Sequence, residues 1–156
     1  MAKAFYRVES FEGRRSLGYL IRRLDNLVKP RAEALFADAD LSFSQWVVLM
    51  ALRDGIATTC GEVARHLQHD TGATTRLIDQ MEERGLIERR RCTEDRRVVR
   101  LAITPAGKKM AKSLMPRIVE FWNETLDGFS GEEFDKLVEM LTRLTARLEE
   151  RPAEAP

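Results

Sequence analysis

Residues 59–103 decide the fold and read TCGEVARHLQHDTGATTRLIDQMEERGLIERRRCTEDRRVVRLAI. The first half has apolar residues at helical spacing in two short segments, which the polar residues 68–71 separate. The second half has two short apolar segments around a charged tip at residues 93–97, which is the pattern of a β-hairpin. The stretch therefore predicts two helices joined by a tight turn and followed by a hairpin.

Both helices of this stretch have residues that mark their limits. Thr59 and Glu62 have the spacing of a capping box, in which two side chains satisfy free N–H groups of the first turn. Gly85 follows the second helix at a position where glycine is preferred. Their apolar inner faces consist of Val63, Ala64, Leu67, Leu77, Ile78 and Met81.

Further helices are expected before this stretch. Apolar residues at three- and four-residue steps over residues 17–28 predict a first helix, which Pro30 then kinks or ends. Ser42 and Gln45 form a second capping box, and the helix that follows is expected to end at about Arg53.

Two long helices are expected after the hairpin. Thr104 and Pro105 are the residue types preferred at a helix start, and Pro116 is a potential kink in the helix that follows. Ser130 and Glu133 cap a final helix with a nearly heptad apolar seam. The chain is therefore expected to be mainly α-helical with one small β-hairpin.

The charge of the chain is balanced in total but uneven along the sequence. The 156 residues include 26 Lys and Arg against 25 Asp and Glu, and 44% hydrophobic residues are enough for one domain with a core. Residues 84–100 nevertheless hold seven arginines, which repel one another unless an anion is nearby. These are Arg84, Arg89, Arg90, Arg91, Arg96, Arg97 and Arg100.

Several classes of protein are not indicated. No segment approaches the roughly 18 apolar residues of a membrane span, and the N-terminus lacks the apolar core of a signal peptide, so we expect a cytoplasmic protein. The sequence has no glycine-rich phosphate loop, nucleophile elbow or evident carboxylate pair. We therefore expect neither an enzyme nor a cofactor.

The cysteines and histidines give only weak patterns. Cys60 and Cys92 are not in a metal-binding or Cys-x-x-Cys spacing, which fits a reducing compartment. Either thiol could be a redox switch, because a helix N-terminus or nearby arginines can lower a thiol pKa, but inert thiols are the favoured interpretation. His66 and His69 beside Asp70 are a weak metal pattern, and no metal is expected.

The order of two helices, a tight turn and a charged hairpin is typical of a winged helix-turn-helix. In that fold a recognition helix enters the major groove of DNA, and the hairpin forms a wing. Small residues at the start of the second helix would allow close approach to bases, and the helix N-terminus would favour phosphate. The candidate DNA-binding residues are Thr59, Thr71, Gly72, Ala73, Thr74, Thr75, Arg76, Asp95, Arg96 and Arg97. The alternative for residues 71–75 is that they only begin an ordinary exposed helix. The alternative for the arginines of the hairpin is that they are only a solvated run of charges.

Three segments resemble the MarR (multiple-antibiotic-resistance regulator) family of transcription factors. They are GLIERR at residues 85–90, EDRR at 94–97 and LAITPAG at 101–107, and residues 41–49 add to the likeness. The resemblance implies that Arg97 enters the minor groove, that Asp95 braces the wing and that residues 71–76 face the major groove. One departure from the family pattern is Cys92-Thr93, where the family commonly has Asp-Pro. This difference bears on the geometry of the wing tip and not on the existence of the wing.

The resemblance also implies an obligate homodimer and a division of the single domain 1–156. Residues of about 1–40 and 105–150 would form the dimerisation helices, about 41–104 the winged helix-turn-helix, and 151–156 a tail. The partner would be a double-stranded, pseudo-palindromic DNA operator.

Family members often lose DNA affinity when a small aromatic acid or phenol binds them, which implies an effector site here. Ser16, Tyr19, Arg23 and Trp46 are its candidate residues, because Tyr19 and Arg23 share a helix face and Trp46 offers an apolar wall. The alternative is that Trp46 belongs to the core and Arg23 is a solvated charge. The function expected is that of a ligand-responsive repressor, and the alternative is a dimeric winged-helix protein-interaction module that does not bind DNA.

Overall fold

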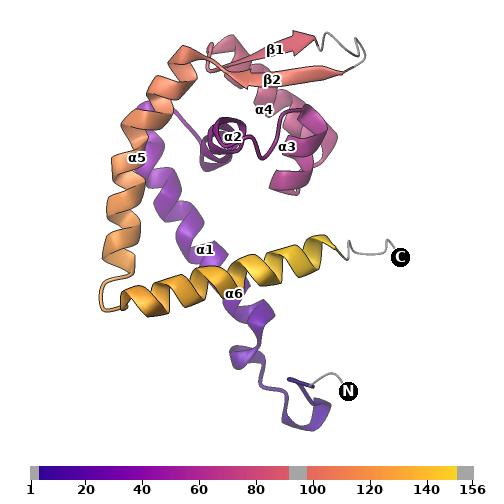
Figure 1. The fold of residues 1–156 in the computed structure, drawn as a ribbon, viewed down its shortest axis with the longest axis vertical. Helices are drawn as coiled ribbons and strands as arrows, with labels where there is room; N and C mark the ends of the chain where they lie inside the picture. Colours follow the sequence, from indigo (N-terminus) through magenta and orange to yellow (C-terminus); the bar gives the residue numbers. More distant parts are fainter. Residues whose placement is uncertain (1–3, 92–97, 151–156) are drawn as a thin grey trace. The chain divides into compact units, whose positions relative to one another are not determined.

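The computed structural model describes residues 4–91 and 98–150 (Figure 1). It is mainly helical with one two-stranded antiparallel hairpin, as the sequence predicts. The chain divides into two compact units, residues 1–118 and residues 119–156. In chain order the elements are η1 Val8–Ser10, η2 Gly13–Arg15, α1 Leu17–Phe36, η3 Ala37–Ala39, α2 Phe43–Arg53, α3 Cys60–Leu67, α4 Thr71–Glu83, β1 Ile87–Arg91, β2 Val99–Ile103, α5 Pro105–Thr125 and α6 Gly131–Glu149.

The predicted helix starts are confirmed by their hydrogen bonds. The three capping boxes begin α2, α3 and α6, and in each the N-cap hydroxyl accepts from the backbone of the third helical residue. Thr104 accepts a hydrogen bond of 3.0 Å from the backbone of Gly107 at the start of α5. Local side-chain chemistry therefore determines where these helices begin.

Proline does not end either of the long helices that contain it. α1 continues through Pro30 to Phe36, and α5 continues through Pro116 to Thr125. Proline removes one backbone N–H from the helix. The carbonyl that loses its donor is that of Asn26, and on the next carbonyl, that of Leu27, the guanidinium of Arg31 donates a hydrogen bond of 2.7 Å.

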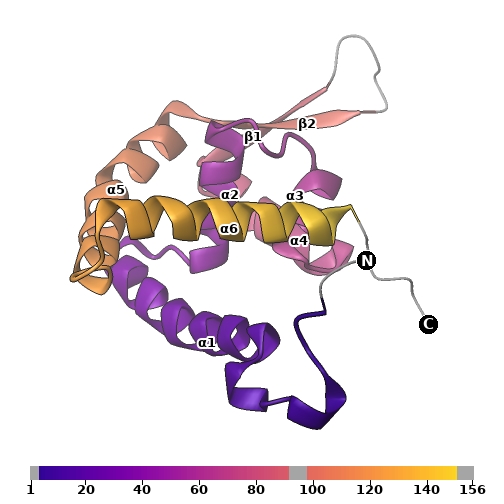
Figure 2. The same ribbon diagram turned by 60° about the horizontal axis from the view of Figure 1, so that its bottom comes forward.

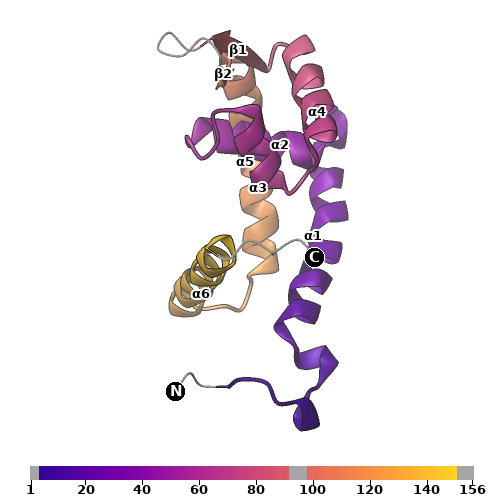
Figure 3. The same ribbon diagram turned by 90° about the vertical axis from the view of Figure 1, so that its right-hand side faces the viewer.

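The core of residues 1–118 lies around α2. Val48 and Leu49 of α2 are fully buried, and Ile78 of α4 and Ile87 of β1 are buried with them. Each such side chain contributes about 1.5–3 kcal/mol relative to an exposed one. This core holds α4 and the hairpin to α2, which is the arrangement seen in Figure 3.

The hairpin is joined by a third extended segment. β1 and β2 pair in a register from Ile87 opposite Ile103 to Arg91 opposite Val99. The backbone N–H of Leu101 donates to the carbonyl of Thr58 at 2.7 Å, and Thr59 forms an isolated bridge with Arg100. The start of α3 is therefore attached to the hairpin (Figure 2).

Large apolar side chains remain exposed on α1 and α6. Leu20, Ile21 and Leu24 of α1 are each more than two fifths exposed, and α6 has no buried residue along its length. Val138, Leu141 and Leu148 of the expected heptad seam are exposed on α6. Exposed apolar surface of this extent is typical of a protein–protein interface.

No single helix in the described part of the chain has the length and hydropathy of a membrane span. Only the segments Leu17–Ala39 and Phe43–Arg53, bent by 84° at their junction, meet that criterion together.

Gly107 is required by a close backbone approach. A Cβ atom at this position would lie 2.1 Å from the carbonyl oxygen of Leu86. This contact is too close, so the backbone at Leu86 would have to move. We expect Gly107→Ala to lower the free energy of unfolding by about 1–3 kcal/mol in urea titrations. A Cβ at Gly131 would meet nothing within 4 Å, so Gly131→Ala is the control and should not destabilise. Equal stability of both variants would contradict this packing.

Candidate nucleic-acid interface

α3 and α4 form a helix-turn-helix with a short, hydrogen-bonded turn. Gln68 ends α3 in the left-handed conformation with φ of 53°, and the backbone N–H of His69 donates to the carbonyl of Ala64 at 3.0 Å. Asp70 is the N-cap of α4 and accepts from the backbone of Ala73 at 2.8 Å. The sequence prediction of two helices and a tight turn is therefore confirmed.

The start of α4 presents four of its six candidate residues to solvent. Thr71, Gly72, Thr75 and Arg76 are exposed, and Ala73 is half-buried. These small side chains leave the helix backbone accessible, and Arg76 makes no ion pair within the described residues. This surface has the properties that major-groove recognition requires.

Thr74 does not belong to this surface, which corrects the expectation from sequence. Its exposed fraction is 0%, and its hydroxyl donates to the carbonyl of Asp70 at 3.0 Å. Residues three and four apart share a helix face, so Thr74 lies on the buried face with Ile78 and Met81.

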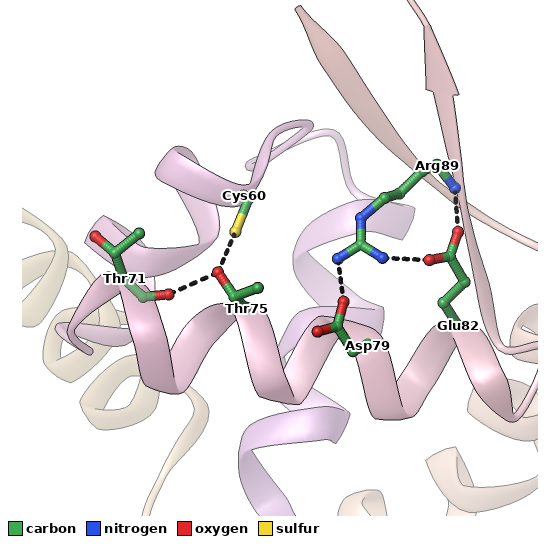
Figure 4. Close-up of polar contacts among 6 residues, drawn as sticks. All are labelled: Cys60, Thr71, Thr75, Asp79, Glu82 and Arg89. Carbon is green, nitrogen blue, oxygen red and sulfur yellow. Dashed lines mark hydrogen bonds and ion pairs between the residues drawn. The ribbon is translucent and has the colours of Figure 1, made fainter.

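The hydroxyls of Thr59 and Thr75 already have partners within the chain. Thr75 donates to the carbonyl of Thr71 at 2.8 Å, and the Sγ atom of Cys60 lies 4.0 Å from the same hydroxyl (Figure 4). The half-buried Thr59 accepts from the backbone of Glu62 at 3.3 Å. Thr59 therefore caps α3, whereas the exposed Thr75 keeps acceptor capacity toward solvent.

The N-terminus of α4 is occupied by a carboxylate from its own chain. The pKa of Asp70 is lowered, first by the hydrogen bond from the backbone of Ala73 and further by Gly72 and the charge of Arg76. Asp70 thus accepts N–H groups of the first turn and places a negative charge at this helix N-terminus. The expectation that this N-terminus favours phosphate therefore stays a prediction, for which Asp70 is a competing anion.

Arg89 attaches β1 to α4. Its guanidinium lies 2.6 Å from the carboxylate of Asp79 and also pairs with Glu82, whose carboxylate accepts from the backbone of Arg89 at 3.0 Å (Figure 4). Asp79 and Glu82 are three residues apart on one face of α4. The charge of Arg89 is therefore balanced internally, and its side chain positions the hairpin against the helix.

Two further arginines of the run have partners within the protein. Arg84 donates to the carbonyls of Ala39 and Asp40, and Arg90 pairs with Glu88. The anions and carbonyls that relieve the repulsion within the run thus come partly from the chain itself.

The cations left for a nucleic acid are fewer than the sequence suggested. Arg91 and Arg100 are exposed, and Arg100 reaches the hydroxyl of Thr58 at 3.4 Å. The candidates Asp95, Arg96 and Arg97 lie outside the described residues, as does Cys92.

The four candidate effector residues do not lie together within one chain. Trp46 has an exposed fraction of 6% and stacks on Phe36 with ring centroids 5.2 Å apart. Tyr19 precedes Phe36 by 17 positions in α1, which corresponds to about 25 Å along a helix. Trp46 is thus a core residue, as the alternative interpretation held.

The other three effector candidates lie at the start of α1. Ser16 is its N-cap, and the Ser16 hydroxyl donates to the carbonyl of Gly13 at 2.7 Å and accepts from the backbone of Tyr19 at 3.3 Å. Tyr19 and Arg23 are exposed on this helix. In the described part of the chain no group of three or more His, Cys, Asp or Glu side chains could hold a metal ion.

The two neighbouring arginines of β1 provide a matched test of the attachment to α4. Arg89→Ala leaves Asp79 and Glu82 without their shared partner, and we expect a loss of about 1–2 kcal/mol of unfolding free energy in urea titrations. Arg90→Ala removes only an exposed ion pair and should cost less than about 1 kcal/mol. Equal losses would show that Arg89 does not hold β1 to α4.

Comparison with known proteins identifies this arrangement. Residues 41–99 match the model of the MarR family. An uncharacterised HTH-type transcriptional regulator of Bacillus subtilis, YsmB, is 26% identical over 124 residues, which cover 80% of this chain and 85% of that protein.

Two solved structures are similar in fold. The Staphylococcus aureus MepR–DNA complex has a TM-score of 0.72 at 21% identity and covers 88% of this chain and 99% of its own. Bordetella bronchiseptica BpsR, described with regulation of DNA binding by 6-hydroxynicotinic acid, has a TM-score of 0.73 at 24% identity, with coverages of 86% and 96%. Residues 41–99 of this chain thus match the MarR family, whose members are transcription regulators and not enzymes, and the fold is that of winged-helix structures.

Proposed function

We propose that this protein binds a specific DNA operator as a homodimer in the cytoplasm and represses transcription. The observation that carries the proposal is the exposed, small-residue start of α4, on a helix that Arg89 attaches to the hairpin. α4 would enter the major groove, and the hairpin, with Arg96 and Arg97 at its tip, would contact the neighbouring backbone and minor groove.

The homodimer is supported by the exposed apolar side chains of α1 and α6. A monomer would leave Leu20, Ile21 and Leu24 of α1 in water, together with the apolar residues of α6. Burial against a second copy would remove this surface from solvent. Two α4 helices related by a twofold axis would then contact half-sites about 34 Å apart on a pseudo-palindromic operator. Occupation of such an operator in a promoter would block polymerase.

Within α4, Arg76 is the residue best placed to test DNA recognition. We expect Arg76→Ala to weaken specific binding by about 1–3 kcal/mol, roughly 5- to 150-fold, in fluorescence anisotropy titrations with DNA from upstream of the gene. If Arg76 contacts phosphate, the slope of the logarithm of the binding constant against the logarithm of salt concentration should also become less steep, by about one released counterion. Arg143→Ala on α6 removes the same charge outside the helix-turn-helix and is the control.

The two variants separate the proposal from its main alternative. Equal affinity of the Arg76 and Arg143 variants would contradict the placement of α4 in the major groove. Absence of DNA binding by the unaltered protein, even at low salt, would favour the dimeric protein-interaction module.

We further propose that a small aromatic acid or phenol weakens DNA binding. BpsR, which shares the fold, supports this class of effector through the aromatic acid in its description. Tyr19 and Arg23, four residues apart and exposed on α1, offer a hydroxyl and a cation for a carboxylate. By linkage, an effector that prefers the DNA-incompetent conformation must lower the affinity for DNA.

Salicylate is a suitable probe of this effector class. We expect it to raise the dissociation constant of the protein–DNA complex at least fivefold, and Arg23→Ala to remove that response. Arg22→Ala is the control, because Arg22 is the adjacent arginine and pairs with Asp25 instead. An unchanged dissociation constant, or equal responses of the two variants, would count against an aromatic acid at Arg23.

A further inference from the structure

A polar cleft lies where α1, η3, α2 and α4 meet, within residues 1–118. Its volume is about 530 Å³, which is sufficient for a small organic molecule. The α4 residues that line it, Gln80 and Glu83, belong to the C-terminal half of that helix, whereas Thr71–Arg76 begin it. The cleft is therefore separate from the surface proposed to contact DNA.

The charges of the cleft favour a cation. Glu33, Asp40 and Glu83 line it together with a single arginine, Arg84, so the formal charges sum to two negative. The guanidinium of Arg84 is already engaged by the carbonyls of Asp40 at 2.5 Å and Ala39 at 3.2 Å. An anion would have to compete with these carbonyls and approach three carboxylates, whereas a cation would gain from all three.

A buried amide in the same cleft provides a second, independent indication of a ligand. The Gln45 side chain belongs to a residue with an exposed fraction of only 7%, and its Oε1 accepts from the backbone of Ser42 at 3.1 Å and from Arg84 at 3.4 Å. Its Nε2 has no hydrogen-bond partner among the described residues.

The free Nε2 of Gln45 is not fully enclosed by the protein. No side-chain nitrogen or oxygen in the described part of the chain is both fully buried and unpaired, so Nε2 keeps some solvent contact, and Gln45 is one of the residues that line the cleft. A nearly buried donor gains from an acceptor that a ligand supplies. The cleft thus combines a donor from the protein with an excess of carboxylates.

We propose that this cleft binds a small organic cation that has an ammonium group and a hydrogen-bond acceptor. The ammonium group pairs with Glu83 and its neighbouring carboxylates, and the acceptor receives the N–H of Gln45. The apolar Leu41 and Ala37 lie along the same cleft and contact the carbon skeleton. The inference goes beyond the proposed function, since it concerns a site that no DNA contact requires.

Two molecules that differ in one charged group test this site. Tyramine has an ammonium group and a phenolic oxygen, and 3-(4-hydroxyphenyl)propanoate has the same skeleton with a carboxylate instead. Each is titrated into the DNA-free protein by calorimetry and by two-dimensional NMR of the Gln45 side-chain amide. We expect saturable binding of tyramine with a shift of the Gln45 resonances, and at least tenfold weaker binding of the propanoate.

Two glutamate variants with equal charge changes locate the binding. Glu83 is exposed and accepts no side-chain hydrogen bond from the described residues, so Glu83→Gln should fold and bind tyramine about three- to fivefold more weakly. Glu124→Gln on α5 lies outside the cleft and should bind tyramine like the unaltered protein. Absence of tyramine binding at millimolar concentration, equal binding of both molecules, or equal affinity of both variants would overturn the proposal. Because DNA is absent from these titrations, such a failure would leave the proposed regulator function unaffected.

Discussion

The burial of one face of α4 against the core around α2 is the constraint on which the interface depends. Thr74, Ile78 and Met81 recur at helical spacing and are fully buried. Because this face is held in the core, Thr75 and Arg76 are oriented outward and exposed, and Thr71 at the start of the helix is exposed as well. The same burial places Asp79 and Glu82 toward β1, where Arg89 pairs with both. Packing of one helix face thus determines both the candidate recognition surface and the attachment of the hairpin.

The charged side chains of α4 and the hairpin stabilise the structure as well as forming a candidate recognition surface. Arg84, Arg89 and Arg90 have acceptors inside the chain, so their side chains position neighbouring elements. The helix N-terminus of α4 has a carboxylate of its own, Asp70. In the described residues the positive surface therefore comes from fewer side chains than the arginine run contains, and those of Arg76 and Arg91 are among them.

The features that could be predicted from sequence depend on local interactions. Capping boxes involve residues three positions apart, so the starts of α2, α3 and α6 were predictable from Ser42, Thr59 and Ser130. The hairpin was predictable for the same reason, because its two strands are close in sequence.

The features that sequence reasoning missed depend on contacts between distant residues. The partners of Arg89 lie on α4, and the pattern of two acids three residues apart facing an arginine-rich strand was the available signal. Trp46 was proposed for an effector site although its stacking on Phe36 buries it, which only the packing of α1 on α2 reveals. Thr74 is a candidate for DNA contact because it is a small residue at the start of the helix, although its spacing from Ile78 already indicates the buried face.

The short η3 segment lies between the helix proposed for dimerisation, α1, and the helix proposed for DNA recognition, α4. Arg84, the C-cap of α4, donates to the carbonyls of Ala39 and Asp40, and from α5, Arg117 donates to the carboxylate of Asp38 at 2.8 Å. The pKa of Asp38 is lowered, with the hydrogen bond from Arg117 as the main cause. η3 follows directly on α1, the helix with exposed apolar residues, so these two arginines link α1 to both α4 and α5. η3 is therefore the segment at which α1, α4 and α5 of one chain are attached to one another.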